Sequence, residues 1–348
     1  MSNLTGVLAS IPSPPASWAA FPVWIFTIHT YALCILLGII VAVIVTSRRL
    51  TARGAEPGVV LDIAVPAIIL GLVGARAYHV LTHPLDYFTG AHPWYYVFEI
   101  WLGGNAIFGS LIGGAVGVAL GCRFTGLKFL SLADALAPGL LLAQAIGRIG
   151  NWFNTELYGM PTSLPWGLQV PSDNPAYPKG LPAGTLFSPT FLYELIWDAV
   201  GAAIILTIEH RVRVSRTAEG RPQVQVTTRI PLRWGRAIAL YFIWYGLGRA
   251  WFESIRLDPT TVVLGLRINV WTAFVTILLG VVLLGWSLRR HVGLEASVYR
   301  LGRQWVPKDR TVGSVYTAAD FAPETAGQAA ADGADRVVTA TSGSPARR

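Results

Sequence analysis

The sequence predicts an all-α, polytopic membrane protein with about seven transmembrane helices. Of its 348 residues, 53% are hydrophobic and only 13% are charged, and the mean hydropathy is +0.50. These values are far from those of a soluble domain of this size. A helix needs about 20 apolar residues to cross about 30 Å of hydrocarbon. The stretches that meet this need approximately cover residues 21–46, 59–80, 106–121, 130–149, 191–208, 237–252 and 270–288.

Basic residues in alternate connections predict the orientation of these spans. One set of connections is rich in arginine and lysine: Arg48, Arg49, Arg53, Arg123, Lys128, the stretch 211–236, Arg289 and Arg290. The other set holds only Lys179, Arg256 and Arg267. By the positive-inside rule the N-terminus lies outside and the C-terminus inside the cell. Topology and contact with anionic membrane lipids then account for the net charge of +8, so we expect no nucleic-acid partner.

The spans divide the chain into segments along its length. Residues 1–20 form an outer N-terminal segment without the basic start of a cleavable signal peptide, so the first span targets the chain. The transmembrane domain covers 21–290, and its third and sixth spans are short and Gly-rich or polar. Charge in the flanking loops supports both of these spans.

Two loops and a tail complete this organisation. Residues 155–188, rich in Pro, Gly, Ser and Asn, are predicted to form an ordered outer cap over a site. The basic stretch 209–236 is predicted to be a cytoplasmic loop. Residues 291–348 form a cytoplasmic tail, which we expect to be disordered after about residue 313 because it has little apolar content.

A dense polar stretch directly follows the fourth apolar run. Arg148, Asn151, Asn154 and Glu156 lie within nine residues, although a charged side chain costs roughly 2.5–3.5 kcal/mol at the bilayer centre. Such residues face protein, water or a bound headgroup, which favours a functional site. The structural alternative is an arginine that snorkels at a helix end, with asparagine capping the next turn.

The sixth span carries a second polar stripe. Tyr245, Arg249, Glu253 and Arg256 follow one another at spacings of four, four and three, which places them on one helical face. The structural alternative is an Arg249–Glu253 ion pair without further function. Two arginines from different spans can bind phosphate oxygens bidentately, and a phospholipid headgroup is the obvious anion at that depth. We therefore predict that Arg148 and Arg249 together grip a lipid phosphate beside one cavity.

The stretch Gly-Arg-Ile-Gly-Asn-Trp-Phe-Asn-Thr-Glu-Leu-Tyr-Gly over 147–159 resembles the signature of the prolipoprotein diacylglyceryl transferase family. Its one departure is Trp152, where the signature has Phe. Further segments resemble family motifs in the same order, and they extend the resemblance over residues 21–286: His29-Thr30-Tyr31, Gly74-Ala75-Arg76 with Tyr78, Gly103-Gly104 to Gly113-Gly114, Ser188 to Glu194, and Tyr245 to Arg249 with Glu253 and Arg256.

This resemblance implies a reaction, its partners and a location. The family transfers the diacylglyceryl group of phosphatidylglycerol to the lipobox cysteine thiol of an exported prolipoprotein, which forms a thioether and releases glycerol phosphate. It needs no cofactor. The implied location is the bacterial plasma membrane, the inner membrane where there are two, with the active site toward the outer face.

The resemblance also assigns candidate roles to residues. The catalytic candidates are Arg148, Arg249, Tyr31, Asn151, Glu156 and Glu253, and the candidates for binding phosphatidylglycerol are Arg148, Arg249, Asn154, Gly159, Tyr245 and Arg76. Gly159 is expected to permit a turn. Arg76 is either a third phosphate contact or a snorkelling arginine. Asp134, in the fourth span, is either a partner of Arg148 or a polar contact at a helix bend.

Two departures from the family leave the base for the cysteine thiol undecided. Phe108 stands where many members have a candidate histidine, and Ser188 replaces another frequent histidine. The replacement candidates are Glu156, Glu253, Tyr31 and His29, because a positioned base typically contributes about 10²–10⁴-fold. A variant with His at position 108 should be tolerated but not required.

Metal chemistry and two other classes of function are weaker interpretations. The only cysteines are Cys34 and Cys122, and the outer histidines His79, His83 and His92 have no convincing further ligand, so we predict no metal site. A flippase or transporter would also need buried charges, but no internal repeat is visible. An intramembrane protease is disfavoured because the chain has no Gly-x-Ser-x-Gly motif.

Overall fold

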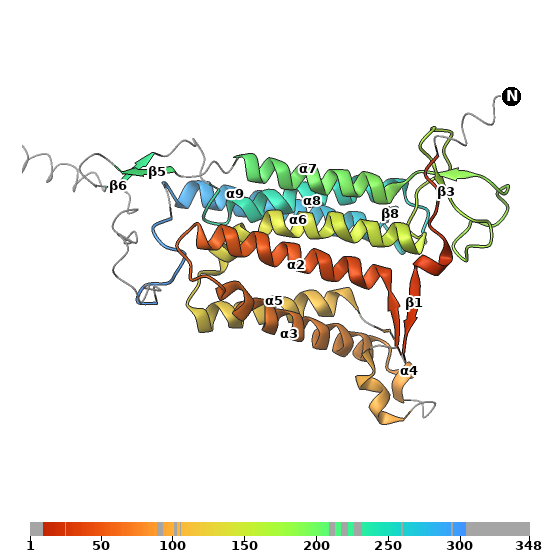
Figure 1. Cartoon of the computed structure of the whole chain (residues 1–348), viewed down its shortest axis with the longest axis horizontal. Coiled ribbons are helices and arrows are strands. Elements are labelled where there is room, and N and C mark those ends of the chain that lie inside the picture. The colour runs from red at the N-terminus through yellow and green to blue at the C-terminus, as the bar shows by residue number, and fades with distance from the viewer. Residues whose placement is uncertain are drawn as a thin grey trace, which may run out of the picture.

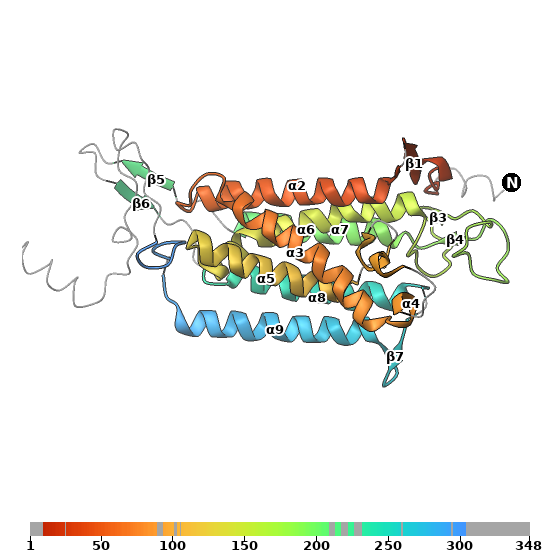
Figure 2. The ribbon, with the colours of Figure 1, turned by 90° about the horizontal axis from the view of Figure 1, so that it is seen from below.

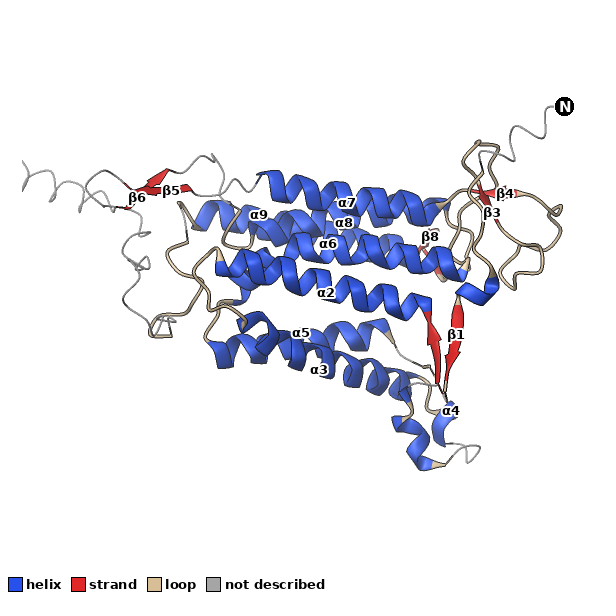
Figure 3. Ribbon diagram, in the orientation of Figure 1, coloured by secondary structure: helices blue, strands red, loops and turns tan. Residues whose placement is uncertain are grey.

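The computed structural model shows a bundle of long helices with small two-stranded sheets at its ends (Figures 1 and 3). We call the end that carries residues 155–188 the cap end and the opposite end the tail end. The structure describes residues 10–24, 26–88, 93–100, 103–104, 106–208, 213–216, 222–225, 232–258, 260–293 and 295–303. His92, Trp101, most of the basic loop 209–236 and the tail from 304 lie outside the described residues.

The predicted spans correspond to long helices. In chain order these are α2 (Thr30–Thr51), α3 (Val59–Thr82), α5 (Ile107–Thr125), α6 (Phe129–Asn154), α7 (Thr190–Ile208), α8 (Arg236–Ile255) and α9 (Ile268–Arg290), with a short α4 (Leu85–Phe88) after α3. Within the described part of the chain, six helices are long and apolar enough to cross a membrane, namely all the long ones except α8. The fold class is therefore confirmed, whereas a count of seven spans and their orientation stay predictions.

The start of the first predicted span is not helical. Residues 20–29 form an antiparallel hairpin of β1 (Ala20–Val23) and β2 (Phe26–His29), and α2 begins only at Thr30. Pro22 explains the difference, because a proline in a helix interior removes a hydrogen bond and clashes with the preceding turn. Trp24 begins the hairpin turn with a φ of 55°. Two short 3-10 helices, η1 (Ala16–Trp18) and η2 (Trp94–Phe98), also lie at the cap end.

Helix α6 lies at the centre of the bundle and packs against α2, α7 and α8, while α8 also packs against α9. Helices α3 and α5 lie side by side in both views (Figures 1 and 2), and glycines bring their backbones together. A Cβ at Gly113 would lie 2.0 Å from the carbonyl oxygen of Leu70, and one at Gly109 would lie 2.1 Å from that of Gly74. The Gly-rich character of the third span thus serves close helix packing.

Asp134 anchors the first turn of α8 and does not reach Arg148. Its fully buried carboxylate accepts hydrogen bonds from the backbone N–H of Gly235, at 2.7 Å, and of Ile238, at 3.0 Å. Fourteen residues of helix, at about 1.5 Å each, put about 21 Å between Asp134 and Arg148. A role as partner of Arg148 is therefore wrong, and the contact is an N-cap supplied by another helix.

The segment after α9 crosses the tail end of the bundle. Tyr299 is buried in a core cluster with Leu50, Val59 and Leu127, which belong to α2, α3 and the connection before α6. Glu295 is also buried, and its Oε1 accepts a hydrogen bond of 2.6 Å from the hydroxyl of Ser131. Residues 295–303 therefore tie the end of α9 to the first half of the chain. Burial raises the pKa of Tyr299.

The cap has its own small core at the opposite end. Strands β3 (Leu168–Gln169) and β4 (Leu186–Phe187) pair antiparallel, and their residues Leu168 and Phe187 form a buried cluster with Tyr158 and Val170. Burial raises the pKa of the Tyr158 hydroxyl, which donates to the carbonyl of Ala176. A second hairpin, β7 (Val262–Val263) and β8 (Leu266–Arg267), joins α8 to α9 at this end, and β5 (Arg213–Arg216) pairs with β6 (Pro222–Gln225) at the tail end.

Candidate active site

A small, partly open cavity lies where α6, α7 and α8 meet. One charged residue of α6, two of α7 and one of α8 line it together with aromatic side chains and a glycine: Arg148, Glu194, Trp197, Asp198, Tyr245, Gly248, Arg249 and Phe252. The two arginines predicted to act together thus share one cavity, although 100 residues lie between them in the sequence. Tyr245, predicted to bind lipid, lies in the same wall.

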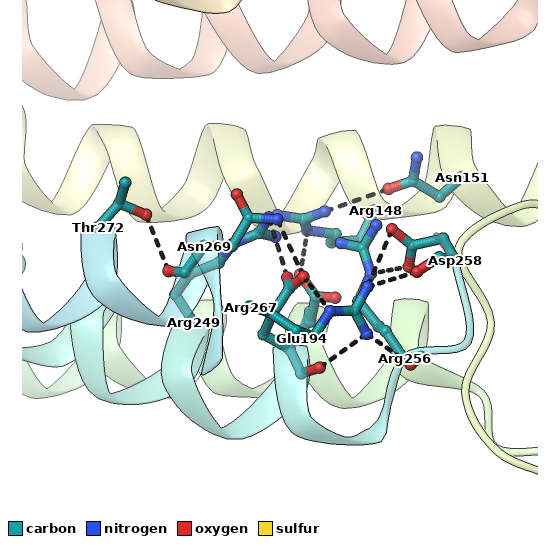
Figure 4. Close-up of polar contacts among 10 residues, drawn as sticks. Arg148, Asn151, Glu194, Arg249, Arg256, Asp258, Arg267, Asn269 and Thr272 are labelled. Carbon is teal, nitrogen blue, oxygen red and sulfur yellow. Dashed lines mark hydrogen bonds and ion pairs between the residues drawn. The ribbon is translucent and has the colours of Figure 1, made fainter. Parts of the chain in front are cut away.

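Arg148 is held in place by partners on two elements. Its Nε forms an ion pair of 2.9 Å with Oε2 of Glu194 on α7, and its Nη1 donates to Oδ1 of Asn151 at 3.4 Å (Figure 4). The Arg148 side chain is 20% exposed and that of Glu194 only 7%. A snorkelling arginine would extend toward water, so the packed ion pair favours a built site over that alternative.

Glu253 organises the corresponding group on α8. It is fully buried, and its Oε2 pairs with Nη2 of Arg249 at 3.1 Å, four residues earlier on the same helix. Its Oε1 pairs with Nε of Arg267 and accepts a hydrogen bond from Nδ2 of Asn269, both at 2.9 Å (Figure 4). The Arg249–Glu253 ion pair expected as the structural alternative does form, and it forms at the edge of the shared cavity.

The stripe predicted on α8 ends before Arg256. Helix α8 stops at Ile255, and Arg256 follows in extended conformation. Its Nε pairs with Oδ1 of Asp258 at 2.6 Å, and this contact raises the pKa of the Arg256 guanidinium against the opposing effect of burial. The prediction that Arg256 shares a helical face with Tyr245 and Arg249 is therefore wrong.

Asn151, Asn154 and Glu156 form a local network at the end of α6. The side-chain amides of both asparagines donate to Oε1 of Glu156, each at 3.1 Å. The chain turns back at Thr155, whose φ of 50° ends the helix and lets Glu156 approach the last turn. Because Asn151 also accepts from Arg148, this network links the signature stretch to the cavity arginine.

Gly159 and Tyr31 both lie at close contacts of the backbone. Gly159 forms a bridge with Arg256 and its N–H donates to the carbonyl of Ser188. Its φ is not positive, so close packing, and not the predicted turn, requires glycine here; a Cβ would lie 2.9 Å from the carbonyl oxygen of Ile255. Tyr31 packs against Gly150, where a Cβ would lie 2.5 Å from its ring. Neither residue lines the cavity.

Arg76 is not brought to the cavity. It is buried in α3, and its guanidinium donates to the backbone carbonyls of Tyr96, Val97 and Gly103 at 2.6–2.7 Å and to the hydroxyl of Tyr87 at 2.8 Å. These acceptors belong to the connection between α3 and α5. Arg76 therefore organises this loop, and the structure supports neither a phosphate contact nor a snorkelling side chain.

The remaining candidates lie apart from the cavity. Phe108 is about half exposed at the start of α5 and lies near Tyr78, with ring centroids 6.3 Å apart. His29 precedes the first residue of α2. The rings of His79 and His83 stack on each other. Among the residues that the structure describes, no group of three His, Cys, Asp or Glu side chains is arranged to hold a metal ion.

Sequence reasoning gave no role to four residues that the structure places at the site. Glu194 and Asp198 line the cavity, and Arg267 and Asn269 bind Glu253. The two carboxylates had a detectable signal, because they are spaced by four in an apolar helix, where charges are costly. Arg267 ends the β7–β8 hairpin and Asn269 lies in the first turn of α9, so no helical spacing connects them with Glu253.

Comparison with known proteins identifies the family of this chain. The family model for prolipoprotein diacylglyceryl transferase matches residues 19–286. A phosphatidylglycerol–prolipoprotein diacylglyceryl transferase of Leifsonia xyli subsp. xyli is 54% identical over 316 residues, which cover 88% of this chain and 89% of the relative. Proteins of the same name from Bifidobacterium longum and Streptomyces griseus are each 43% identical, over 79% and 84% of this chain and 85% and 82% of the relatives. The chain belongs to the prolipoprotein diacylglyceryl transferase family.

Proposed function

We propose that this multi-pass membrane protein transfers the diacylglyceryl group of phosphatidylglycerol to the lipobox cysteine thiol of exported prolipoproteins, the first step of lipoprotein maturation. The observation that carries this proposal is the shared cavity of Arg148 and Arg249, with carboxylates in its wall. Guanidinium groups bind phosphate oxygens in a planar, bidentate geometry. Family membership supplies the reaction to which this anion site is suited.

The reaction explains why two arginines are useful. The cysteine sulfur attacks the glyceryl carbon that bears the phosphoester oxygen, the carbon–oxygen bond breaks, and glycerol phosphate leaves with the bonding electrons. The thiol proton passes to a base. The phosphodiester becomes a phosphomonoester and gains negative charge, so Arg148 and Arg249 stabilise the transition state more than the bound lipid.

Both arginines keep donors for the lipid. Arg148 uses Nε for Glu194 and Nη1 for Asn151, and Arg249 uses Nη2 for Glu253. Each guanidinium carries five N–H donors in a fixed fork, and both side chains retain about a fifth of their exposure. We infer that the remaining N–H groups meet the phosphate, while the carboxylates hold the guanidinium planes in position.

The positions of the carboxylates narrow the search for the base. Oε1 of Glu156 accepts from two asparagine amides, and Glu253 accepts from Asn269 and forms ion pairs with Arg249 and Arg267. Asp198, in contrast, is buried at the cavity wall beside the charges of Arg148 and Glu194 and forms no hydrogen bond within the described residues. We therefore place Asp198 before Glu194, Glu156, Glu253, Tyr31 and His29 as the candidate to accept the thiol proton.

We also propose the bacterial plasma membrane as the location, with the cap end on the outer face. Arg48 and Arg49 lie in the last turn of α2, and Arg289 and Arg290 lie in the last turn of α9, all at the tail end. Basic residues of this kind favour the cytoplasmic side. An outward-facing cap end would place the cavity on the side where exported prolipoproteins arrive.

A mass spectrum of a lipobox peptide incubated with the purified protein and phosphatidylglycerol tests the proposed function. We expect the peptide to gain the mass of one diacylglyceryl unit, with release of glycerol phosphate. Replacing the lipobox cysteine by serine in the peptide is the matched control and should remove the product. Phosphatidylglycerol that stays chemically unchanged while it moves between leaflets would overturn the proposal in favour of a flippase.

A further inference from the structure

Arg267 contacts more groups at the end of α8 than any role in the β7–β8 hairpin requires. Its Nε pairs with Oε1 of Glu253 at 2.9 Å, and its Nη2 lies 3.5 Å from Oδ2 of Asp258. Its Nη1 donates to the carbonyls of Glu253, at 3.1 Å, and Arg256, at 2.7 Å, and its Nη2 donates to the carbonyl of Asp258, at 2.5 Å. Arg267 thus satisfies carbonyls that the end of a helix leaves without partners, and it reaches the buried carboxylate of Glu253 as well.

Glu253 is shared between two arginines on different elements. Arg249 approaches its Oε2 from the cavity side of α8, and Arg267 approaches its Oε1 from β8. Asn269 adds a neutral hydrogen bond to the same Oε1. Because Glu253 is fully buried, its negative charge depends on these side chains.

The charges around Glu253 determine how well Arg249 can bind an anionic ligand. Two guanidinium groups and one carboxylate give the Arg249–Glu253–Arg267 group a net charge of +1, and the neighbouring Arg256–Asp258 pair adds no net charge. Without Arg267 the same group is neutral, and Arg249 alone has to balance a buried carboxylate. Glu253 then draws Arg249 toward itself more strongly, and fewer N–H groups of Arg249 are left for an anionic phosphate.

We propose that Arg267 is a positioning residue that leaves Arg249 free to bind the lipid phosphate, by holding Glu253 and balancing its charge. This inference rests on the proposed function and extends it to a residue outside the cavity. A merely structural Arg267 would only fix the hairpin to the end of α8. The two roles differ in which substrate is affected, because only the charge-balancing role acts specifically on the anionic lipid.

The experiment measures KM for phosphatidylglycerol, as its mole fraction in mixed micelles, and KM for a lipobox peptide. We expect Arg267→Gln to raise KM for the lipid by about tenfold or more, since loss of one neighbouring charge in a partly buried site is a change of at least this order. KM for the peptide should stay within about twofold, well below the tenfold that 1.4 kcal/mol represents. Arg267→Lys, which keeps the charge, should restore most of the lipid affinity.

Two further variants separate charge from structure. Asn269→Leu removes a neutral hydrogen bond from the same oxygen of Glu253, so it should raise KM for the lipid much less than Arg267→Gln does. In a Glu253→Gln background there is no carboxylate to balance, so the added Arg267→Gln change should have little further effect on KM for the lipid. Equal increases in KM for both substrates, or an undiminished effect of Arg267→Gln in the Glu253→Gln background, would overturn the inference.

Separate controls distinguish a failure of this inference from misfolding of a variant and from a failure of the proposed function. If Arg267→Gln gives no folded protein in detergent, Arg267→Lys and Asn269→Leu still test the inference. The inference requires the lysine variant, which keeps the positive charge, to show a smaller rise in KM for the lipid than the roughly tenfold rise expected when the charge is lost. A lysine variant with a lipid KM raised tenfold and normal thermal unfolding would refute it. Wild-type protein that does not lipidate the peptide contradicts the proposed function instead, whereas active wild type with an unshifted Arg267→Gln variant contradicts only this inference.

Discussion

Arg148 on α6 and Arg249 on α8 line the same cavity, and each already forms an ion pair with a carboxylate, Glu194 for the first and Glu253 for the second. Neither arginine is therefore an unbalanced charge in a membrane protein, which would be costly. The ion pairs fix the two guanidinium planes while leaving N–H groups for a ligand. An anionic lipid then meets donors that are oriented before it binds, and this lowers the cost of ordering them.

Arg148→Ala and Arg249→Ala should each abolish lipidation of the peptide while the protein still inserts into membranes. Arg148→Lys should lower kcat/KM by at least about tenfold, because an ammonium group cannot hold Glu194 and bind phosphate bidentately as a guanidinium does. Initial rates with purified, detergent-solubilised protein measure these effects. Full activity of Arg148→Lys would argue against bidentate phosphate binding.

Asp198→Asn should lower the rate by about 10²-fold or more if Asp198 accepts the thiol proton, since a positioned base typically contributes about 10²–10⁴-fold. The rate should also lose the part of its pH dependence that a carboxylate base produces. Glu156→Gln is the comparison, because it replaces a carboxylate that already accepts from Asn151 and Asn154. A wild-type pH profile in Asp198→Asn would transfer the role to Glu194 or Tyr31.

Phe108→His should leave kcat/KM within about twofold of wild type, less than the factor of ten that 1.4 kcal/mol represents. The ring of Phe108 packs near Tyr78 and does not line the cavity of Arg148 and Arg249. Rates measured from pH 6 to 9, roughly the range over which a histidine and a thiol titrate, provide the check. A large gain in rate would show that position 108 reaches the reacting thiol.

Asp134→Ala should lower the stability of the protein by about 1–3 kcal/mol, because two buried N–H groups at the start of α8 lose their acceptor. Thermal unfolding in detergent measures this loss. KM for phosphatidylglycerol should not change, since Asp134 lies about 21 Å along α6 from Arg148. An altered lipid KM with unchanged stability would contradict this structural assignment.

The sequence predicted the helices well because apolar runs of membrane length have few alternatives. The predicted stretch 130–149 became α6 (Phe129–Asn154), and 270–288 became α9 (Ile268–Arg290). Arg148, Arg249 and Tyr245 were found for a related reason, since polar residues in such runs are expensive and therefore informative. The structure brings these three residues to one cavity.

Contacts between distant segments were less predictable. The partners of Arg76 are backbone carbonyls in a loop, and no residue type or spacing reveals them. Asp134 binds the N-terminus of a helix about 100 residues later in the chain, a pairing set by how α6 and α8 pack. The hairpin of residues 20–29 was missed because most of its residues are apolar like the helix that follows, and Pro22 argues against a helix there.

The buried position of Tyr299 has a practical consequence for work with this protein. Shortening the chain at Arg290 would remove Tyr299, Val298 and Glu295 from the tail end and uncover the apolar ends of α2 and α3. The solubilised protein would then tend to aggregate through this newly exposed apolar surface. Purification tags and fluorescent fusions should therefore be attached after residue 303, so that the contacts of residues 295–303 at the tail end are kept.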